Sequence, residues 1–72
     1  MSYYKYMAKV RVAIISKIKL SGEDVKFHKL YFDISCEYGV HKKFVKEVLD
    51  DLKANGKIIF DLETYDNINW AE

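Results

Sequence analysis

Lysines at the head of a predicted helix are the residues best placed to do chemistry in this chain. Lys42, Lys43 and Lys46 lie near the start of the segment HKKFVKEVLDDLKA, residues 41–54. Their charges suit contact with phosphate groups, so the partner they indicate is a nucleic acid. The placement opposes the helix dipole, which is positive at the N-terminus, and each exposed lysine there costs roughly 0.3–1 kcal/mol. The helix therefore needs a reason to keep them.

A solvated helix face is the alternative interpretation of the same residues. Lys43 and Glu47 stand four positions apart, as do Lys46 and Asp50. Side chains at this spacing meet on a helix surface, and such a pair contributes roughly 0.2–0.5 kcal/mol. Two of the lysines would then be explained without any ligand.

Catalytic chemistry has less support in the sequence. It contains no glycine-rich phosphate loop and no His/Glu spacing typical of a metal site. Asp50 and Asp51 are neighbours on the predicted helix, so their carboxylates point in different directions and do not converge as an acid–base pair. The single cysteine, Cys36, excludes an internal disulfide and a multi-cysteine metal centre. We expect a protein that is not an enzyme and needs no cofactor or metal.

Length and composition predict one soluble domain over residues 1–72. Half of the residues are hydrophobic and 15% are aromatic, which is too apolar for a disordered chain. The formal net charge is only +1, so attraction to an anion must come from where the charges lie. No signal peptide and no apolar run of about 18 residues is present. We expect an intracellular, cytoplasmic protein with no membrane contact, associated with the nucleoid if it binds DNA.

The spacing of apolar residues predicts three helices. The first covers residues 4–20 and stops at Ser21-Gly22, and Val12 and Ala13 widen its apolar surface toward burial on more than one side. The second covers residues 28–38 and the third residues 41–54, each ended by a glycine. Four residues of the third helix share one inward stripe: Val45, Val48, Leu49 and Leu52.

After the third helix the hydrophobic period becomes two, which predicts a β-hairpin. Ile58, Phe60 and Leu62 are expected to face the core, and a turn at TYDN leads to a second strand with Ile68 and Trp70 on one side. A brief strand in which Val25 and Phe27 alternate can add a third member to the sheet. The predicted fold is α+β, with three helices and a C-terminal hairpin.

This order of elements resembles a winged helix-turn-helix domain, of the compact kind found among archaeal and viral transcription regulators. The resemblance covers nearly the whole chain and is carried by the segment YGVHKKFVKEVLDDLKANGKI. Its matching residues are the turn glycine and valine, two leucines three apart, and the glycine and isoleucine that lead into the wing: Gly39, Val40, Leu49, Leu52, Gly56 and Ile58. The resemblance implies sequence-specific binding of double-stranded DNA, with residues 41–54 as a recognition helix in the major groove.

The expected DNA contacts lie at the start of the recognition helix, at the start of the helix before it and at the tip of the wing. They are His41, Lys42, Lys43, Lys46, Lys26, His28, Lys29, Tyr65 and Asn67. For the histidines and the wing residues, an ordinary surface position remains open as the alternative.

Two features depart from the family pattern. Family members commonly begin the recognition helix with a serine or threonine cap, where this chain has His41. The wing is acidic, with Asp61, Glu63 and Asp66. The acidic wing and the small net charge favour a competing hypothesis, a winged-helix protein-interaction module that serves as a small subunit of a replication or transcription complex.

The N-terminal segment predicts self-association. Tyr3, Tyr4, Tyr6 and Met7 form an aromatic-rich start to the first helix. Exposed aromatic patches mark protein interfaces. We expect a homodimer through the first helix and these residues, which would present two recognition helices to DNA half-sites one helical turn apart.

Overall fold

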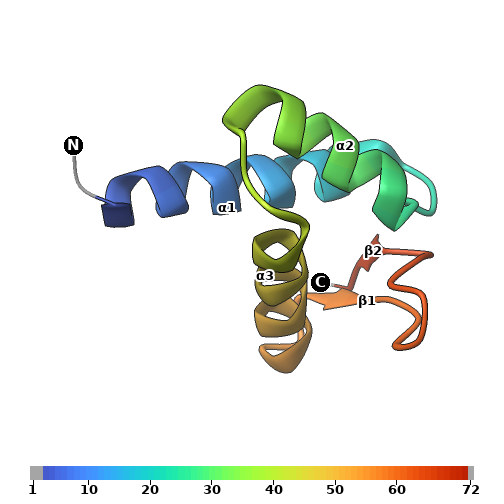
Figure 1. The fold of residues 1–72 in the computed structure, drawn as a ribbon. Coiled ribbons are helices and arrows are strands. Elements are labelled where there is room, and N and C mark those ends of the chain that lie inside the picture. The colour runs from blue at the N-terminus through green and yellow to red at the C-terminus, as the bar shows by residue number, and fades with distance from the viewer. Residues whose placement is uncertain (1–2, 72) are drawn as a thin grey trace.

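The computed structural model describes residues 3–71, and the side chains from residue 6 to residue 71. Over this part of the chain the protein is α+β, with three helices and a two-stranded antiparallel sheet (Figure 1). The elements, in chain order, are α1 (Tyr3–Ser21), α2 (Phe27–Tyr38), α3 (Lys42–Ala54), β1 (Ile58–Ile59) and β2 (Asn69–Trp70). The predicted helix bounds are confirmed to within one residue.

Helices α1 and α2 lie along each other, and α3 runs across them, with the hairpin packed beside α3 and below the C-terminal end of α1 (Figure 1). Four elements (α1, α2, α3 and β1) and the loop between β1 and β2 supply the buried side chains of one hydrophobic core, against which Trp70 of β2 packs, half-buried. The inward stripe of α3 is confirmed. The buried residues are Val10, Ile14, Ile18, Phe27, Leu30, Ile34, Val45, Val48, Leu49, Leu52, Ile58, Phe60 and Ile68.

Helix α1 is buried along one side only. Val10, Ile14 and Ile18 repeat every four residues, so they share one face and are at most 3% exposed. Val12 lies on the other side and is 61% exposed, and Leu20 is 84% exposed. The expectation that Val12 widens the buried surface is therefore wrong, because no other element of the described chain covers that side. Ala13, named with it, is half-buried and packs against the core.

The turn between α2 and α3 depends on a glycine in the left-handed conformation. Gly39 has φ of 68° and its N–H donates to the Ser35 carbonyl at 2.8 Å, which ends α2 as predicted. Val40 then packs against the core, half-buried. His41 takes the cap position of α3, but its side chain makes no capping hydrogen bond.

The hairpin is short, and a third segment joins it. Ile58 pairs with Trp70 and Ile59 with Asn69. Val25 forms an antiparallel bridge to Ile68, with N–H to carbonyl distances of 3.0 and 2.9 Å in the two directions. The third member of the predicted sheet is therefore this single bridge. Phe27, expected in the same strand, instead begins α2 with its side chain buried.

Residues 61–67, between the strands, fold as a compact turn. The Tyr65 N–H donates to the Asp61 carbonyl at 2.7 Å, and the Asp61 N–H to the Asp66 carbonyl at 3.0 Å. Tyr65 and Asn67 adopt positive φ, at 61° and 58°. Because the strand alternation stops at this turn, Leu62 is 69% exposed, and the expectation that it faces the core is wrong.

Candidate nucleic-acid interface

The basic starts of α2 and α3 come together around one ring. The Nζ atoms of Lys42 and Lys46 lie 6.0 and 5.7 Å from the centroid of Phe27, the first residue of α2. Lys26 precedes that ring in the chain and is exposed. The structure therefore joins Lys42 and Lys46 into one basic cluster over Phe27, with Lys26, His28, Lys29, His41 and Lys43 exposed on the adjoining turns.

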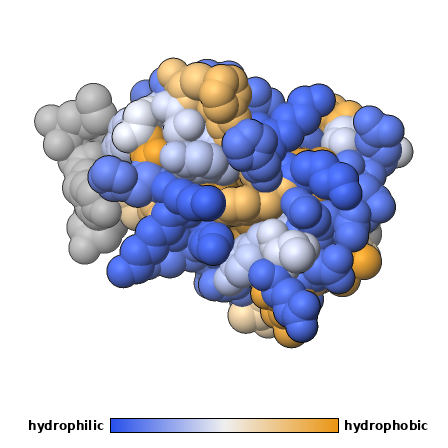
Figure 2. All heavy atoms as spheres, turned by 45° about the vertical axis from the view of Figure 1, so that its right-hand side comes forward, coloured by the Kyte–Doolittle hydropathy of each residue, from blue (hydrophilic) through white to orange (hydrophobic). Residues whose placement is uncertain are grey.

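Four aromatic rings underlie the basic cluster. Phe27 stacks on Tyr31 with 6.2 Å between ring centroids, and Phe60 stacks on Tyr65 with 4.8 Å. The centroids of Phe27 and Tyr65 are 5.7 Å apart, with the rings tilted. Lys42 also lies over Tyr31 at 6.0 Å and Lys46 over Tyr65 at 5.0 Å. A lysine over a ring gains about 0.5–1 kcal/mol at an exposed site. The rings therefore hold both lysine side chains along the surface. The face of the molecule drawn in Figure 2 is mostly hydrophilic, with smaller hydrophobic areas between.

The N-terminal end of α3 keeps its positive potential. No acidic residue lies in its first turn, and no side chain caps it. Free N–H groups at a helix start attract anions. The same end carries Lys42 and Lys43, so the helix dipole and the side-chain charges add at one place.

The start of α2 is capped by the wing loop. The Phe27 N–H donates to Asp66 Oδ1 at 2.9 Å, across 39 positions of sequence. A carboxylate at a helix start satisfies a free N–H and is favoured by the dipole. Asp66, one of the three acidic residues of this loop, therefore stabilises the start of α2.

The ion pairs of the solvated-face interpretation are not formed. Among the described residues, Lys43 makes no ion pair with Glu47, and Lys46 makes none with Asp50. Asp50 instead accepts the Tyr65 hydroxyl, at 2.8 Å to Oδ1 and 3.1 Å to Oδ2. This hydrogen bond, with burial and the carboxylate charge, raises the pKa of Tyr65 above its usual 10.0.

Asp51, the other acidic residue of this helical turn, forms an ion pair with Arg11 of α1. Asp50 and Asp51 are therefore both bound by residues far away in the sequence. Neither of these two carboxylates pairs with a lysine at the start of α3.

The two wing residues expected to reach DNA make contacts within the protein. Tyr65 is half-buried in the ring cluster, and its hydroxyl is bound by Asp50. Asn67 is exposed, donates through Nδ2 to Asp61 at 3.0 Å and accepts from Lys26 Nζ at 3.4 Å. The lysine contact brings Asn67 beside the residue that precedes α2.

Sequence reasoning missed the residues that build the support for the lysines. Phe27 and Tyr31 stand four apart, a spacing that places two rings on one helix face. The sequence contains this signal, but the prediction placed Phe27 in a strand, so the two rings were not recognised as neighbours on one helix. The role of Asp66 had no local signal, because its partner lies in another element.

The residues predicted to form a dimer are only partly described. The side chains of Tyr3 and Tyr4 lie outside the described residues. Tyr6 packs edge-on against Tyr38, with 6.4 Å between ring centres, and Met7 is half-buried. Beside them is an open, largely apolar groove of about 380 Å³, lined by Ala8, Lys9, Val12, Ala13 and Tyr38.

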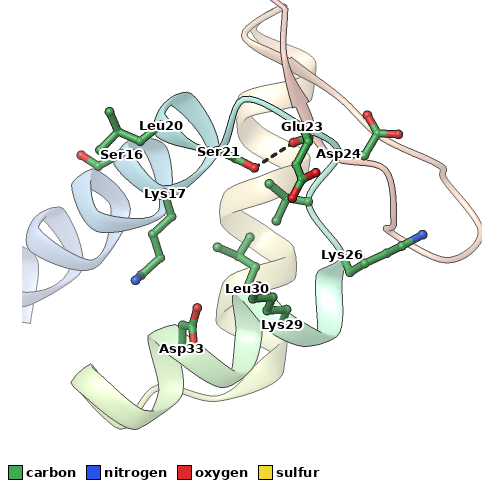
Figure 3. A pocket seen from close by; sticks show the side chains of 11 residues that line it. Ser16, Lys17, Leu20, Ser21, Glu23, Asp24, Lys26, Lys29, Leu30 and Asp33 are labelled. Carbon is green, nitrogen blue, oxygen red and sulfur yellow. Dashed lines mark hydrogen bonds between the residues drawn. The ribbon is translucent and has the colours of Figure 1, made fainter.

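A second groove, of about 460 Å³, lies between the C-terminal half of α1 and the start of α2 (Figure 3). Its floor includes Leu30, and the Ser21 hydroxyl donates to the Glu23 carbonyl at its edge at 2.8 Å. Charged residues of both signs line it: Lys17, Lys26, Lys29, Glu23, Asp24 and Asp33. This mixture does not select for a ligand of one charge.

Within residues 3–71, no three His, Cys, Asp or Glu side chains gather in a way that could hold a metal ion. No helix in this range has the length and apolar character needed to cross a membrane. Comparison of the chain with protein-family models, with curated proteins and with solved structures gives no match.

Proposed function

We propose that this protein is a winged helix-turn-helix domain that binds double-stranded DNA in a sequence-specific manner, as a small transcriptional regulator. The order α1, Val25 bridge, α2, α3, β1, β2 fits that layout. Ile68 pairs with Val25, and β2, which follows it, pairs with β1. This segment therefore lies between Val25 and β1, which also fits the sheet of a winged helix-turn-helix domain. In this proposal α3 is the recognition helix and enters the major groove by its N-terminal part.

The observation that carries the proposal is the basic cluster at the start of α3. Lys42 and Lys46 rest on aromatic rings, with no carboxylate paired to either among the described residues, at a helix end without a side-chain cap. A phosphate there would meet lysine charge and helix N–H groups together. With Lys43, three phosphate contacts give a salt slope of roughly −2.7, at about −0.9 for each contact.

We further propose that the DNA-binding form is a homodimer through α1. The outer side of α1 exposes Val12, which lines the apolar groove at Tyr38, and Leu20 is exposed nearer the C-terminal end of the helix. Helix α1 carries basic residues and no acidic one, which opposes a symmetric contact. Ion pairs of Arg11 with Asp51 and of Lys17 with Glu37 reduce that repulsion. Sedimentation at tens of micromolar should give twice the monomer mass, and a purely monomeric species would refute the dimer.

A protein-interaction module remains the second candidate, because one surface favours it. Leu62 and Ile59 are exposed beside the acidic side chains of Asp61 and Glu63. Apolar residues surrounded by carboxylates suit a basic protein segment better than DNA.

A binding titration separates the two candidates. Fluorescence anisotropy would follow labelled duplex DNA, first a random pool and then a sequence selected from it, at two or more salt concentrations. We expect salt-dependent binding, tighter for the selected sequence. The variant Lys42→Glu/Lys43→Glu should bind at least about tenfold more weakly, with a flatter salt slope.

Lys19→Glu is the matched control, because it reverses an exposed charge near the C-terminal end of α1, outside both the basic cluster and the groove beside Tyr38. It should lower affinity far less than the α3 variant. Equal losses in both, or no binding by the wild type, would refute DNA recognition by α3. If the wild type does not bind DNA, a pull-down with the protein as bait becomes the appropriate experiment, to find a partner of the acidic wing.

A further inference from the structure

Tyr65 binds a cation and an anion that stand four positions apart on α3. Its ring face lies 5.0 Å from Lys46 Nζ, and its hydroxyl donates to Asp50 at 2.8 Å. On a helix, residues at this spacing are neighbours, so Lys46 and Asp50 would otherwise pair with each other. They do not form an ion pair here.

The position of Tyr65 is fixed by more than these two contacts. Its ring stacks on Phe60 at 4.8 Å and meets Phe27 at 5.7 Å, and its backbone N–H is bound to Asp61. A ring held from several sides is restricted in the face that it offers to Lys46. The hydroxyl reaches Asp50 from the wing, across 15 positions of sequence.

We propose that Tyr65 is a positioning residue, which keeps Asp50 from neutralising Lys46 and so leaves the Lys46 ammonium free to meet a DNA phosphate. This inference rests on the proposed function for its ligand, but the separation of the two charges is a property of the protein alone. Tyr65 itself need not touch DNA. The wing then contributes to binding through α3, even though the wing is acidic.

Tyr65→Phe is the informative variant, because it keeps the ring and removes only the hydroxyl. Asp50 then loses its partner and becomes available to Lys46. In DNA titrations we expect about a twofold loss of affinity and a salt slope smaller in magnitude by up to about 0.9. In the Asp50→Asn background the same change at Tyr65 should leave the slope unaltered, since no carboxylate remains to be released.

A second measurement needs no DNA. A double-mutant cycle with Lys46→Met and Asp50→Asn measures the coupling of these residues in urea unfolding. In the wild type the coupling should be absent. In the Tyr65→Phe background it should appear as about a twofold change in the unfolding constant.

The outcomes distinguish the inference from the function on which it rests. Equal coupling in both backgrounds, or an unchanged salt slope in Tyr65→Phe with DNA binding intact, would overturn the positioning role. If the wild type does not bind DNA, the proposed function fails and the role toward phosphate fails with it. The unfolding cycle would then still decide whether Tyr65 separates the two charges.

Discussion

Removing the Asp66 side chain should destabilise α2, although the two are 39 residues apart in the sequence. Asp66 Oδ1 accepts the Phe27 N–H at 2.9 Å, in a partly buried position. The residue that would normally cap α2, Lys26, makes no side-chain capping bond. Asp66 therefore does from the wing what a serine or aspartate usually does from the preceding residue.

The expected loss follows from the two parts of this contact. Loss of an N-cap acceptor costs about 0.5–2 kcal/mol. Asp66→Ala removes both the acceptor and its charge, so it should cost about 1–2 kcal/mol. Asp66→Asn keeps an acceptor and loses only the charge, which is worth about 0.3–1 kcal/mol at a helix start. For a domain of this size, each kcal/mol lowers Tm by about 4–8 °C.

Urea and thermal unfolding followed by circular dichroism would measure these losses, and amide exchange would locate them. Exchange at Phe27 should accelerate in Asp66→Ala. Glu63→Ala is the matched control, since Glu63 is an exposed carboxylate of the same loop, and it should change stability by less than about 0.5 kcal/mol. If Asp66→Ala is no more damaging than Glu63→Ala, the capping role is wrong.

Three further predictions can be checked by the same unfolding measurements. Ile14→Ala should cost about 2–5 kcal/mol, because Ile14 is fully buried at the centre of α1. Gly39→Ala should cost about 1–2 kcal/mol from its φ of 68° alone, since an added Cβ would meet nothing within 4 Å; Gly39→Asn should cost less. Tyr65 has a raised pKa in the folded protein, so its protonated form contributes stability that is complete below pH 10 and is lost as pH rises further. Tyr65→Phe should therefore reduce the alkaline fall in unfolding free energy.

The helices were predictable because their signals are local. In α3 a single stripe of four apolar residues fixes the buried face, and all four are buried. The glycines that end α2 and α3 are likewise read from neighbouring residues, and Gly39 takes the left-handed conformation expected of it. Each of these features depends on residues within one or two helical turns.

The wing and the candidate site were less predictable, since their contacts join distant segments. The pairing of Lys46 with Asp50 was the local expectation, but Tyr65 binds Asp50 from 15 residues away. Asp51 is likewise bound by Arg11, 40 residues away. In the sequence, Leu62 continues the alternating pattern of a strand, but the backbone enters a turn at residue 61. A period along the chain carries no information about such tertiary partners.

The acidic wing and the basic helix start are parts of one arrangement. Cation–ring contacts of about 0.5–1 kcal/mol each are similar in size to the dipole cost of a lysine at a helix start, so the fold tolerates Lys42 and Lys46 without a ligand. Stability therefore does not explain why these positions are cationic, since an apolar side chain would pack on the same rings without the dipole cost. A solvated face would pair Lys43 with Glu47 and Lys46 with Asp50, and those ion pairs are not formed. The arrangement therefore supports the proposal that the start of α3 receives anions from outside the chain.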